Sequence, residues 1–390
     1  MGDTEEHRMT GSRGALHTRG SALGRRPVLA DVARLASVSP TTASSALRGT
    51  GRMAQKTRDR VLAAASRLAY ETDRRASALR RRRSGVLGLV MPDVSGVYRW
   101  RLARAIETEA RRRGFFLSLC FSYGGRDLEQ RLVRTLVGEG VEGLLLFGPI
   151  SRGGGEDVDH LLRLRELGIP FLYVDVYTDH VSAPFVGTDN VLAARLATEH
   201  LLKLGHRRIA YLSAPVEPTS AMRERLQGFS ASLADWGVGP RPQFVIERPT
   251  APVLDDGDPF DPNRQWREIA PSLGRKLSSL TEPPSAIVCA TTDDACVALR
   301  WACDQGLSIP EHLSLVRFDD FPFLPAVGLE FTFVRQPAEE IGSRALEALV
   351  SEISEARSGM PVQVRLAPKL VMGNTTARPP VDEEEVTGHR

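Results

Sequence analysis

The 390-residue chain contains no apolar run near the roughly 20 residues that are needed to cross a bilayer. Residues 1–26 are rich in glycine, serine and arginine, and they lack the apolar central segment of a secretory signal. Four cysteines are too few for a disulfide framework in a chain of this length. From these absences we expect a cytoplasmic protein.

Familiar catalytic and metal-binding patterns are also missing. The glycine run at 153–155 matches neither a P-loop nor a dinucleotide-binding fingerprint. Cys289, Cys296 and Cys303 recur at seven-residue intervals, a pattern that favours buried small apolar side chains over a metal site. His206 has no cysteine or serine nearby in the sequence. We therefore expect no metal, no cofactor and no enzymatic activity.

Positive charge is concentrated at one end of the chain. Residues 1–83 hold 18 of the 51 basic side chains and 7 of the 48 acidic ones, a net charge of +11. The remainder holds 33 basic and 41 acidic side chains, a net charge of −8. A basic head on an acidic body is typical of a phosphate-binding module joined to a second domain. The alternative is a solvated basic tail without a partner.

Residues 27–70 carry three helical patterns and no strand pattern. The segment 32–47 (VARLASVSPTTASSAL) predicts two short helices with a tight turn, because Ser39 is a good N-cap and Pro40 suits the first helical position. A third helix is expected from Gln55 to Ala69. The side chains expected in the core of this unit are Val32, Ala33, Leu35, Ala36, Ala43, Ala46, Leu47, Val61, Leu62, Ala65 and Leu68.

This arrangement is that of a helix-turn-helix, whose second helix enters the major groove. The alternative is a plain three-helix bundle, but the local basicity and the polar outer face of the second helix favour DNA. The expected DNA contacts on this helix are Pro40, Thr41, Thr42, Ser44, Ser45 and Arg48.

From residue 85 onward, short apolar runs alternate with amphipathic helical stretches. We expect strands at 86–92, 115–121, 143–149, 170–176, 208–214, 286–291 and 313–320. We expect helices at about 100–113, 127–138, 157–167, 190–204, 223–236, 294–306 and 337–356. This alternation predicts an α/β fold with parallel sheets in two lobes. Ligands bind such sheets beyond the carboxyl ends of strands, where Asp175 and Asp319 both lie.

The chain resembles the lactose-repressor (LacI/GalR) family from about residue 28 to residue 375. The matching segments are LADVARLASVSPTTASSAL, TRDRVLAAASRLAY, GLVMPD, VEGLLLFGP, ATEHLLKLGHRRIAYLS, RERLQGF, GLSIPEHLSLVRFDD and TFVRQP, in that order. The resemblance implies a homodimeric transcription regulator, usually a repressor, that binds pseudo-palindromic operator DNA. It also implies a two-lobed sensor of the periplasmic sugar-binding type.

In this family a hinge after the head folds on DNA and inserts a leucine into the minor groove. The matching segment here contains Arg74, Arg75, Ala76 and Leu79, with Leu79 as the wedge. The alternative is a linker in which Leu79 has no special role. The chain departs from the family pattern at Thr72 and Asp73, where proline and asparagine are usual. It also departs at Ser45, where an arginine that could contact guanine is often found.

The resemblance also implies an effector site between the lobes. Arg225 matches the family's effector-binding arginine, and Asp319 and Asp175 are expected to accept hydrogen bonds from hydroxyl groups. Thr291 falls where an asparagine is common, with Thr292 or Asp293 as the alternatives for this role. Tyr98 lies near the family's aromatic pair, and Arg99 replaces the second aromatic. Each residue has a structural alternative, such as a helix cap or a surface position. Arg99 together with Arg225 suggests an anionic effector, although family effectors include neutral sugars.

The expected domains are a disordered extension at 1–26, the helix-turn-helix at 27–72 and a hinge at 73–84. They are followed by the sensor and dimerisation domain at 85–378 and a disordered acidic tail at 379–390. Two other function classes are weighed against a regulator. An enzyme is disfavoured by the missing motifs, and a transport-type solute-binding protein would need no basic head.

Overall fold

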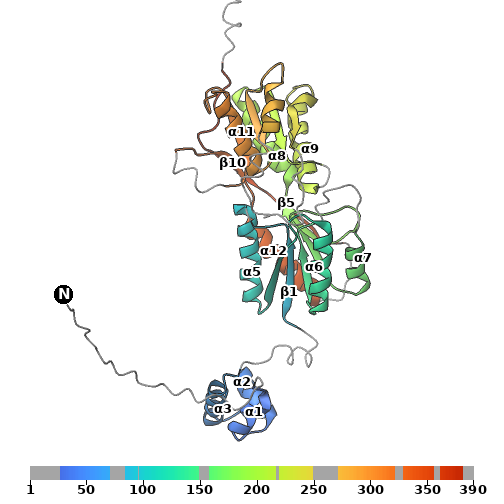
Figure 1. Cartoon of the computed structure of the whole chain (residues 1–390), viewed down its shortest axis with the longest axis vertical. Helices are drawn as coiled ribbons and strands as arrows, with labels where there is room; N and C mark the ends of the chain where they lie inside the picture. The colour runs from blue at the N-terminus through green and yellow to red at the C-terminus, as the bar shows by residue number, and fades with distance from the viewer. Residues whose placement is uncertain are drawn as a thin grey trace, which may run out of the picture. The chain divides into compact units, whose positions relative to one another are not determined.

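The computed structural model describes residues 27–70, 84–94, 96–148, 158–216, 219–248, 271–320, 328–354 and 361–380. The chain divides into two compact units, Met1–Arg82 and Arg83–Arg390 (Figure 1). The expected N-terminal extension, the hinge residues 73–83 and the tail residues 381–390 lie outside the described residues. Among the described residues, no helix combines the length and apolar character that crossing a membrane requires.

The first unit consists of α1 (Leu29–Leu35), α2 (Pro40–Arg48) and α3 (Gln55–Arg67). Helix α2 begins where the sequence predicts, because the Ser39 side chain accepts a hydrogen bond from the Thr42 backbone N–H at 3.1 Å. It ends at Arg48 and is capped by Gly49, which has a φ of +69°. The core of this head is built from Val32, Ala33, Ala36, Ala43, Ala46, Val61, Ala64 and Ala65, with Leu47 and Leu68 partly buried against it.

Two leucines that were expected in this core lie on the surface. Leu35 is 42% exposed and Leu62 is 46% exposed. Because alanines line most of the helix contacts, the three helices approach closely and leave no room for these larger side chains. The prediction was therefore wrong for Leu35 and Leu62. Helix α3 also ends at Arg67, two residues before the predicted Ala69.

The second unit contains two lobes, each built on one sheet. The sheet of the N-terminal lobe has the order β11-β5-β4-β3-β1-β2, and all of its pairings are parallel. Its strands are β1 (Val86–Met91), β2 (Phe116–Phe121), β3 (Gly143–Leu146), β4 (Phe171–Val174), β5 (Phe185–Thr188) and β11 (Gln363–Leu366). Helices α5 (Val97–Arg112) and α12 (Ala338–Ser354) cover one face, and α6 (Arg126–Gly138) and α7 (Asp159–Glu166) cover the other (Figure 1).

The sheet of the C-terminal lobe has the order β12-β10-β9-β8-β6-β7 and is parallel except for the β10–β12 pair. Its strands are β6 (Ile209–Ser213), β7 (Val245–Glu247), β8 (Ala286–Cys289), β9 (Ser314–Phe318), β10 (Thr332–Arg335) and β12 (Lys369–Val371). Helices α8 (Asn190–Leu204) and α9 (Ser220–Asp235) lie against each other on one face, and α11 (Thr292–Asp304) lies on the other. A 3₁₀ turn at Pro242–Phe244 precedes β7.

The chain passes between the lobes three times, after β5, after β10 and after β11. One continuous apolar core runs through both lobes on the side of α5, α12, α8 and α9, and separate cores lie beneath α6 and α7 and beneath α11. The carboxyl ends of strands in both sheets therefore meet near the crossings, which is where a ligand site is expected in such sheets.

The two-lobed α/β architecture is confirmed, and each of the seven predicted apolar runs contains a strand. Strands β5, β7, β10, β11 and β12 were not predicted, because each has only three or four residues interrupted by glycine, threonine or charged side chains. The expectation of three buried cysteines was wrong for Cys303. Cys289 is buried and Cys296 partly buried, but Cys303 is exposed near the end of α11.

Candidate functional site

The outer face of α2 presents part of the predicted DNA contacts to solvent. Pro40, Thr41 and Arg48 are exposed, whereas Thr42, Ser44 and Ser45 are partly buried. The Thr42 hydroxyl also forms a hydrogen bond of 2.8 Å with the Ser39 hydroxyl. Its hydroxyl therefore helps to build the helix N-terminus, and Pro40 and Thr41 are the most accessible of the N-terminal residues. The predicted contacts at Arg74, Arg75, Ala76 and Leu79 lie outside the described residues.

Asp175 and Asp319 occupy equivalent positions in the two lobes. Asp175 follows β4 at a φ of +67°, and Asp319 follows β9 at a φ of +65°. Each donates its backbone N–H to a neighbouring strand, Asp175 to the Val186 carbonyl at 2.9 Å and Asp319 to the Val334 carbonyl at 3.0 Å. Aspartate tolerates the left-handed region better than most residues, and such strain concentrates at functional sites.

Tyr98 links the first helix of the N-terminal lobe to Asp175. Both side chains are buried, and the Tyr98 hydroxyl donates a hydrogen bond to the Asp175 carboxylate. Burial and the neighbouring carboxylate raise the pKa of Tyr98 well above 10, so the phenol remains a donor. Burial also raises the pKa of Asp175, against the opposing effects of the Tyr98 hydrogen bond and the charge of Arg225.

Arg225 comes from α9. It contacts Asn190 and Gln336, which lie at two of the places where the chain passes between the lobes. Its side chain is 4% exposed. Its Nε donates to the Asn190 amide oxygen at 2.8 Å, and its Nη1 donates to the Ala290 carbonyl at 2.6 Å. The guanidinium also stacks over the Phe318 ring, 4.0 Å from the ring centroid. Arg225 is therefore fixed by neutral partners, which leaves its charge available to the nearby carboxylates.

Gln336 joins Arg225 to Asp319. Its amide nitrogen donates to both Asp319 carboxylate oxygens, at 3.0 and 2.9 Å. Its amide oxygen accepts from Arg225 Nη2 at 3.1 Å and from the Thr188 hydroxyl at 2.8 Å. Burial raises the pKa of Asp319 to about 6, although the charge of Arg225 and the Gln336 hydrogen bond both oppose this shift. This buried glutamine connects groups from both lobes.

Arg99 is already paired within its own lobe. Its Nη1 lies 2.6 Å from Asp93 Oδ2, and its guanidinium stands 5.6 Å from the Phe147 ring centroid. Its side chain is about one third exposed. An effector would therefore meet an arginine whose charge is already compensated by a carboxylate.

Thr291 is a helix cap, which was the structural alternative to an effector contact. It is the N-cap of α11, accepting a hydrogen bond from the Asp294 backbone N–H at 3.2 Å. Its hydroxyl donates to Asp294 Oδ2 at 2.6 Å. Asp294 is completely buried, and Arg248 forms an ion pair with it, with Nε 3.0 Å from Oδ1. An effector contact through Thr291 stays a prediction.

We expect the substitution Asp294→Asn to change how stability depends on pH. Burial raises the pKa of Asp294 from 3.8 to about 6, against the charge of Arg248. Between about pH 4 and 6 the folded state then binds more protons at this group than the unfolded state does, so its contribution makes the free energy of unfolding fall as pH rises. Relative to D294N, the wild-type protein should gain about 2 kcal/mol on acidification from pH 6.5 to 4.5.

Urea unfolding at a series of pH values measures this difference. Asp293→Asn is the matched control, because this neighbouring side chain is 55% exposed. A difference between wild type and D294N that is the same at every pH would contradict the prediction.

The structure thus brings five of the six candidate effector residues together, whereas Arg99 is paired with Asp93. Asp175, Arg225 and Asp319 lie together, with Tyr98 bonded to Asp175, and Thr291 follows the carbonyl that Arg225 contacts. Four residues of this region were not predicted from the sequence to belong to the site: Asn190, Gln336, Phe318 and Asp93. Gln336 lies in the TFVRQP segment that matched the family, so a search for polar residues just after strands would have found it.

Three family models match the chain. Residues 28–73 match bacterial regulatory proteins of the lacI family, and residues 84–251 match the periplasmic binding proteins and sugar binding domain of the LacI family. Residues 198–376 match a periplasmic binding protein-like domain. Together the three models cover residues 28–73 and 84–376.

Relatives cover almost the entire chain. An uncharacterized HTH-type transcriptional regulator in the aml 5′ region of Streptomyces limosus is 33% identical over 353 residues, which span 90% of this chain and 95% of that protein. The HTH-type transcriptional regulator MalR from Streptomyces coelicolor is 31% identical over 358 residues, with 90% and 97% coverage.

Solved structures show the same fold. The Lac repressor dimer bound to operator and the anti-inducer ONPF aligns with a TM-score of 0.73 at 22% identity, covering 90% of this chain and all of that chain. A complex of the transcriptional regulator CelR with cellobiose aligns with a TM-score of 0.63 at 26% identity and the same coverage. With its helix-turn-helix head and two-lobed sensor, the chain belongs to the LacI family of bacterial transcriptional regulators.

Proposed function

We propose that this regulator is a cytoplasmic homodimeric repressor that binds a pseudo-palindromic operator and is controlled by a neutral sugar bound between its lobes. The observation that carries the proposal is the position of Arg225. This buried arginine is held by groups from the crossings and lies next to carboxylates from both lobes. A ligand at this point can be sensed by both lobes together.

DNA binding is supported by the exposed face of α2 and by the net charge of +11 on residues 1–83. Pro40 and Thr41 at the start of the helix would read base edges, and Arg48 would reach phosphate. Because Ser45 replaces an arginine that is common in the family, we expect an operator that lacks the guanine contact at that position. Arg74, Arg75, Ala76 and Leu79 complete the proposed interface on the strength of the family resemblance.

A neutral effector is favoured by the charge balance around Arg225. Four arginines of the region, Arg99, Arg225, Arg248 and Arg317, are outnumbered by the carboxylates Asp93, Asp175, Asp293, Asp294 and Asp319. Two of these arginines are already paired with carboxylates. An added phosphate or carboxylate would therefore meet repulsion. Sugar hydroxyls can both donate to carboxylates and accept from Arg225, so a polyol fits this set of groups.

Two solved structures of similar proteins contain neutral sugars. CelR has been solved with cellobiose, and a LacI family regulator from Enterococcus faecium has been solved with bound ribose. We therefore propose a neutral sugar in preference to the anionic effector that Arg99 and Arg225 suggest. The relatives are transcriptional regulators, and no enzymatic role is proposed.

Control of DNA binding would follow from two arrangements of the lobes. An effector that binds one arrangement more tightly shifts the equilibrium by that difference in affinity, and the coupling is reciprocal with DNA. The competing function is a solute-binding protein without a DNA role, and the experiment below distinguishes the two.

The proposal is tested by selecting bound sequences from a randomised duplex library, with wild type and Leu79→Ala side by side. We expect a pseudo-palindrome with a deformable central step, bound at least tenfold more weakly by L79A, because the lost wedge no longer stabilises the bent duplex. Leu62→Ala is the control, since it also shortens a leucine to alanine, at a position of the head that is exposed. Enrichment of no sequence by wild type, with or without sugars, would favour the solute-binding alternative.

A further inference from the structure

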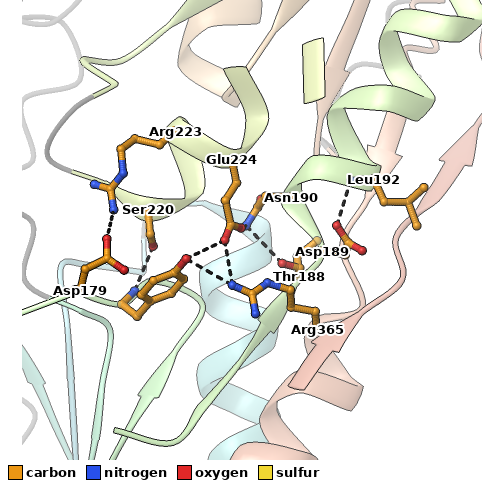
Figure 2. A network of polar contacts seen from close by, with 10 residues as sticks. Asp179, Thr188, Asp189, Asn190, Leu192, Ser220, Arg223, Glu224 and Arg365 are labelled. Carbon is orange, nitrogen blue, oxygen red and sulfur yellow. Dashed lines mark hydrogen bonds and ion pairs between the residues drawn. The ribbon is translucent and has the colours of Figure 1, made fainter. Parts of the chain in front are cut away.

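A second cluster joins the two lobes beside the effector site. We call it the inter-lobe clasp, and it consists of Tyr177 and Arg365 from the N-terminal lobe with Ser220 and Glu224 from the C-terminal lobe. Figure 2 shows Arg365 and Glu224 facing each other, with Ser220 and Arg223 on the same helix as Glu224. Arg365 lies on β11, the edge strand next to β5.

Glu224 is the centre of the clasp. Its Oε1 accepts hydrogen bonds from the Tyr177 hydroxyl at 2.9 Å and from Arg365 Nη2 at 3.0 Å. The Glu224 side chain is 12% exposed and that of Arg365 is 38% exposed, so water reaches this ion pair mainly from its arginine end. The Arg365 guanidinium also stands 5.6 Å from the Tyr177 ring centroid and 5.4 Å from that of Phe185. Opening of the lobes would break all of the Glu224 contacts with the N-terminal lobe.

The backbone is tied across the same boundary. The Tyr177 N–H donates to the Ser220 hydroxyl at 3.0 Å. Hydrogen exchange of this amide therefore reports opening of the lobes, because the hydrogen bond that protects it exists only while the two lobes remain in contact. A second pair, Arg223 with Asp179 at 2.9 Å, also crosses between the lobes, but its side chains are 34% and 69% exposed. Solvent-exposed pairs of this kind contribute little, so it provides a matched control.

Asn190 connects the clasp to Arg225. Its amide oxygen accepts from Arg225 Nε at 2.8 Å, and its amide nitrogen lies 3.5 Å from Glu224 Oε2. Asn190 begins α8 directly after the first crossing between lobes. Glu224 and Arg225 are thus neighbours in sequence that face different partners, with one amide side chain between them.

We propose that Glu224, Arg365 and Tyr177 clasp the two lobes in the arrangement described here, and that Asn190 transmits the state of Arg225 to this clasp. The clasp itself stands independently of the effector, whereas its use in regulation rests on the proposed function. Glu224 acts in this scheme as a positioning residue, since it reaches the effector site only through Asn190.

Hydrogen exchange at the Tyr177 amide of the full-length protein tests the clasp without any ligand or DNA. In Glu224→Gln we expect this amide to exchange about tenfold to hundredfold faster, because a hydrogen-bonded ion pair is lost. Tyr177→Phe should have a smaller effect in the same direction, and Arg223→Gln should stay within about threefold of wild type. Amides of β3, in the core of the N-terminal lobe, should be unchanged, which separates lobe opening from unfolding.

The transmission step is tested by a double-mutant cycle in the same assay. Arg225→Gln should change the Tyr177 exchange rate by at least fivefold in the wild-type background and by less than twofold in an Asn190→Ala background. Equal Tyr177 exchange in wild type, E224Q and Y177F would overturn the clasp. Additive effects of R225Q and N190A would overturn the transmission through Asn190. Neither result depends on whether a sugar is the effector, so failure of the proposed function would be recognised separately.

Discussion

Arg225→Ala is expected to weaken sugar binding strongly and to lower the free energy of unfolding of the sensor by about 3 kcal/mol. The guanidinium makes three hydrogen bonds to neutral groups and stacks on Phe318. Its removal takes this donor from the Asn190 amide oxygen and the Ala290 carbonyl. It also deprives Asp175 and Asp319 of a cation that lowers the pKa of both. Affinity for a bound sugar should fall at least about hundredfold, since hydrogen bonds to a charged group are lost as well.

Isothermal titration with a sugar that binds wild type, together with urea unfolding, measures both effects. Arg223→Ala is the control, because this arginine lies two positions earlier on α9 and its side chain is 34% exposed. We expect R223A to bind the sugar as wild type does. An R225A protein that keeps wild-type sugar affinity would place the effector somewhere else.

Gly228→Ala is expected to destabilise the sensor by about 3 kcal/mol or more, although alanine is the better helix former. A Cβ at Gly228 would lie 2.3 Å from the Val191 carbonyl oxygen and 3.0 Å from the Ala194 Cβ. Since the obstacle is backbone of α8, helix α9 would have to move away as a whole. Glu224 and Arg225 lie on that helix, so sugar affinity should fall together with stability.

Urea unfolding and sugar titration again provide the measurement. Gly138→Ala is the matched control, because Gly138 ends helix α6 with no atom within 4 Å of the added methyl group. We expect G138A to be as stable as wild type or slightly more stable. A G228A protein with wild-type stability would show that the contact between α8 and α9 can adjust.

The sequence predicted those parts of the site that follow local rules. Asp175 and Asp319 were found because apolar strands end just before them, and α8 has the bounds 190–204 that its apolar periodicity predicts. Ser39 and Pro40 marked the start of α2 for similar reasons of capping and backbone geometry. These features depend on neighbours within a few positions.

Contacts between residues far apart in the sequence were not predicted. Arg365 and Glu224 are 141 positions apart, and Gln336 is 111 positions from Arg225. No local pattern marks such partners, because the crossings between lobes bring them together. Arg99, which was expected to attract an anion, has a partner closer in the sequence. Its charge is compensated by Asp93, six positions away and not on α5.

The most direct test of the account is the effect of neutral and phosphorylated sugars on a preformed complex with the selected operator. We predict that at least one neutral mono- or disaccharide changes operator affinity fivefold or more, that Arg225→Ala removes this change, and that the phosphorylated counterpart is weaker. A change produced only by phosphorylated sugars, or one that R225A leaves intact, would contradict the account.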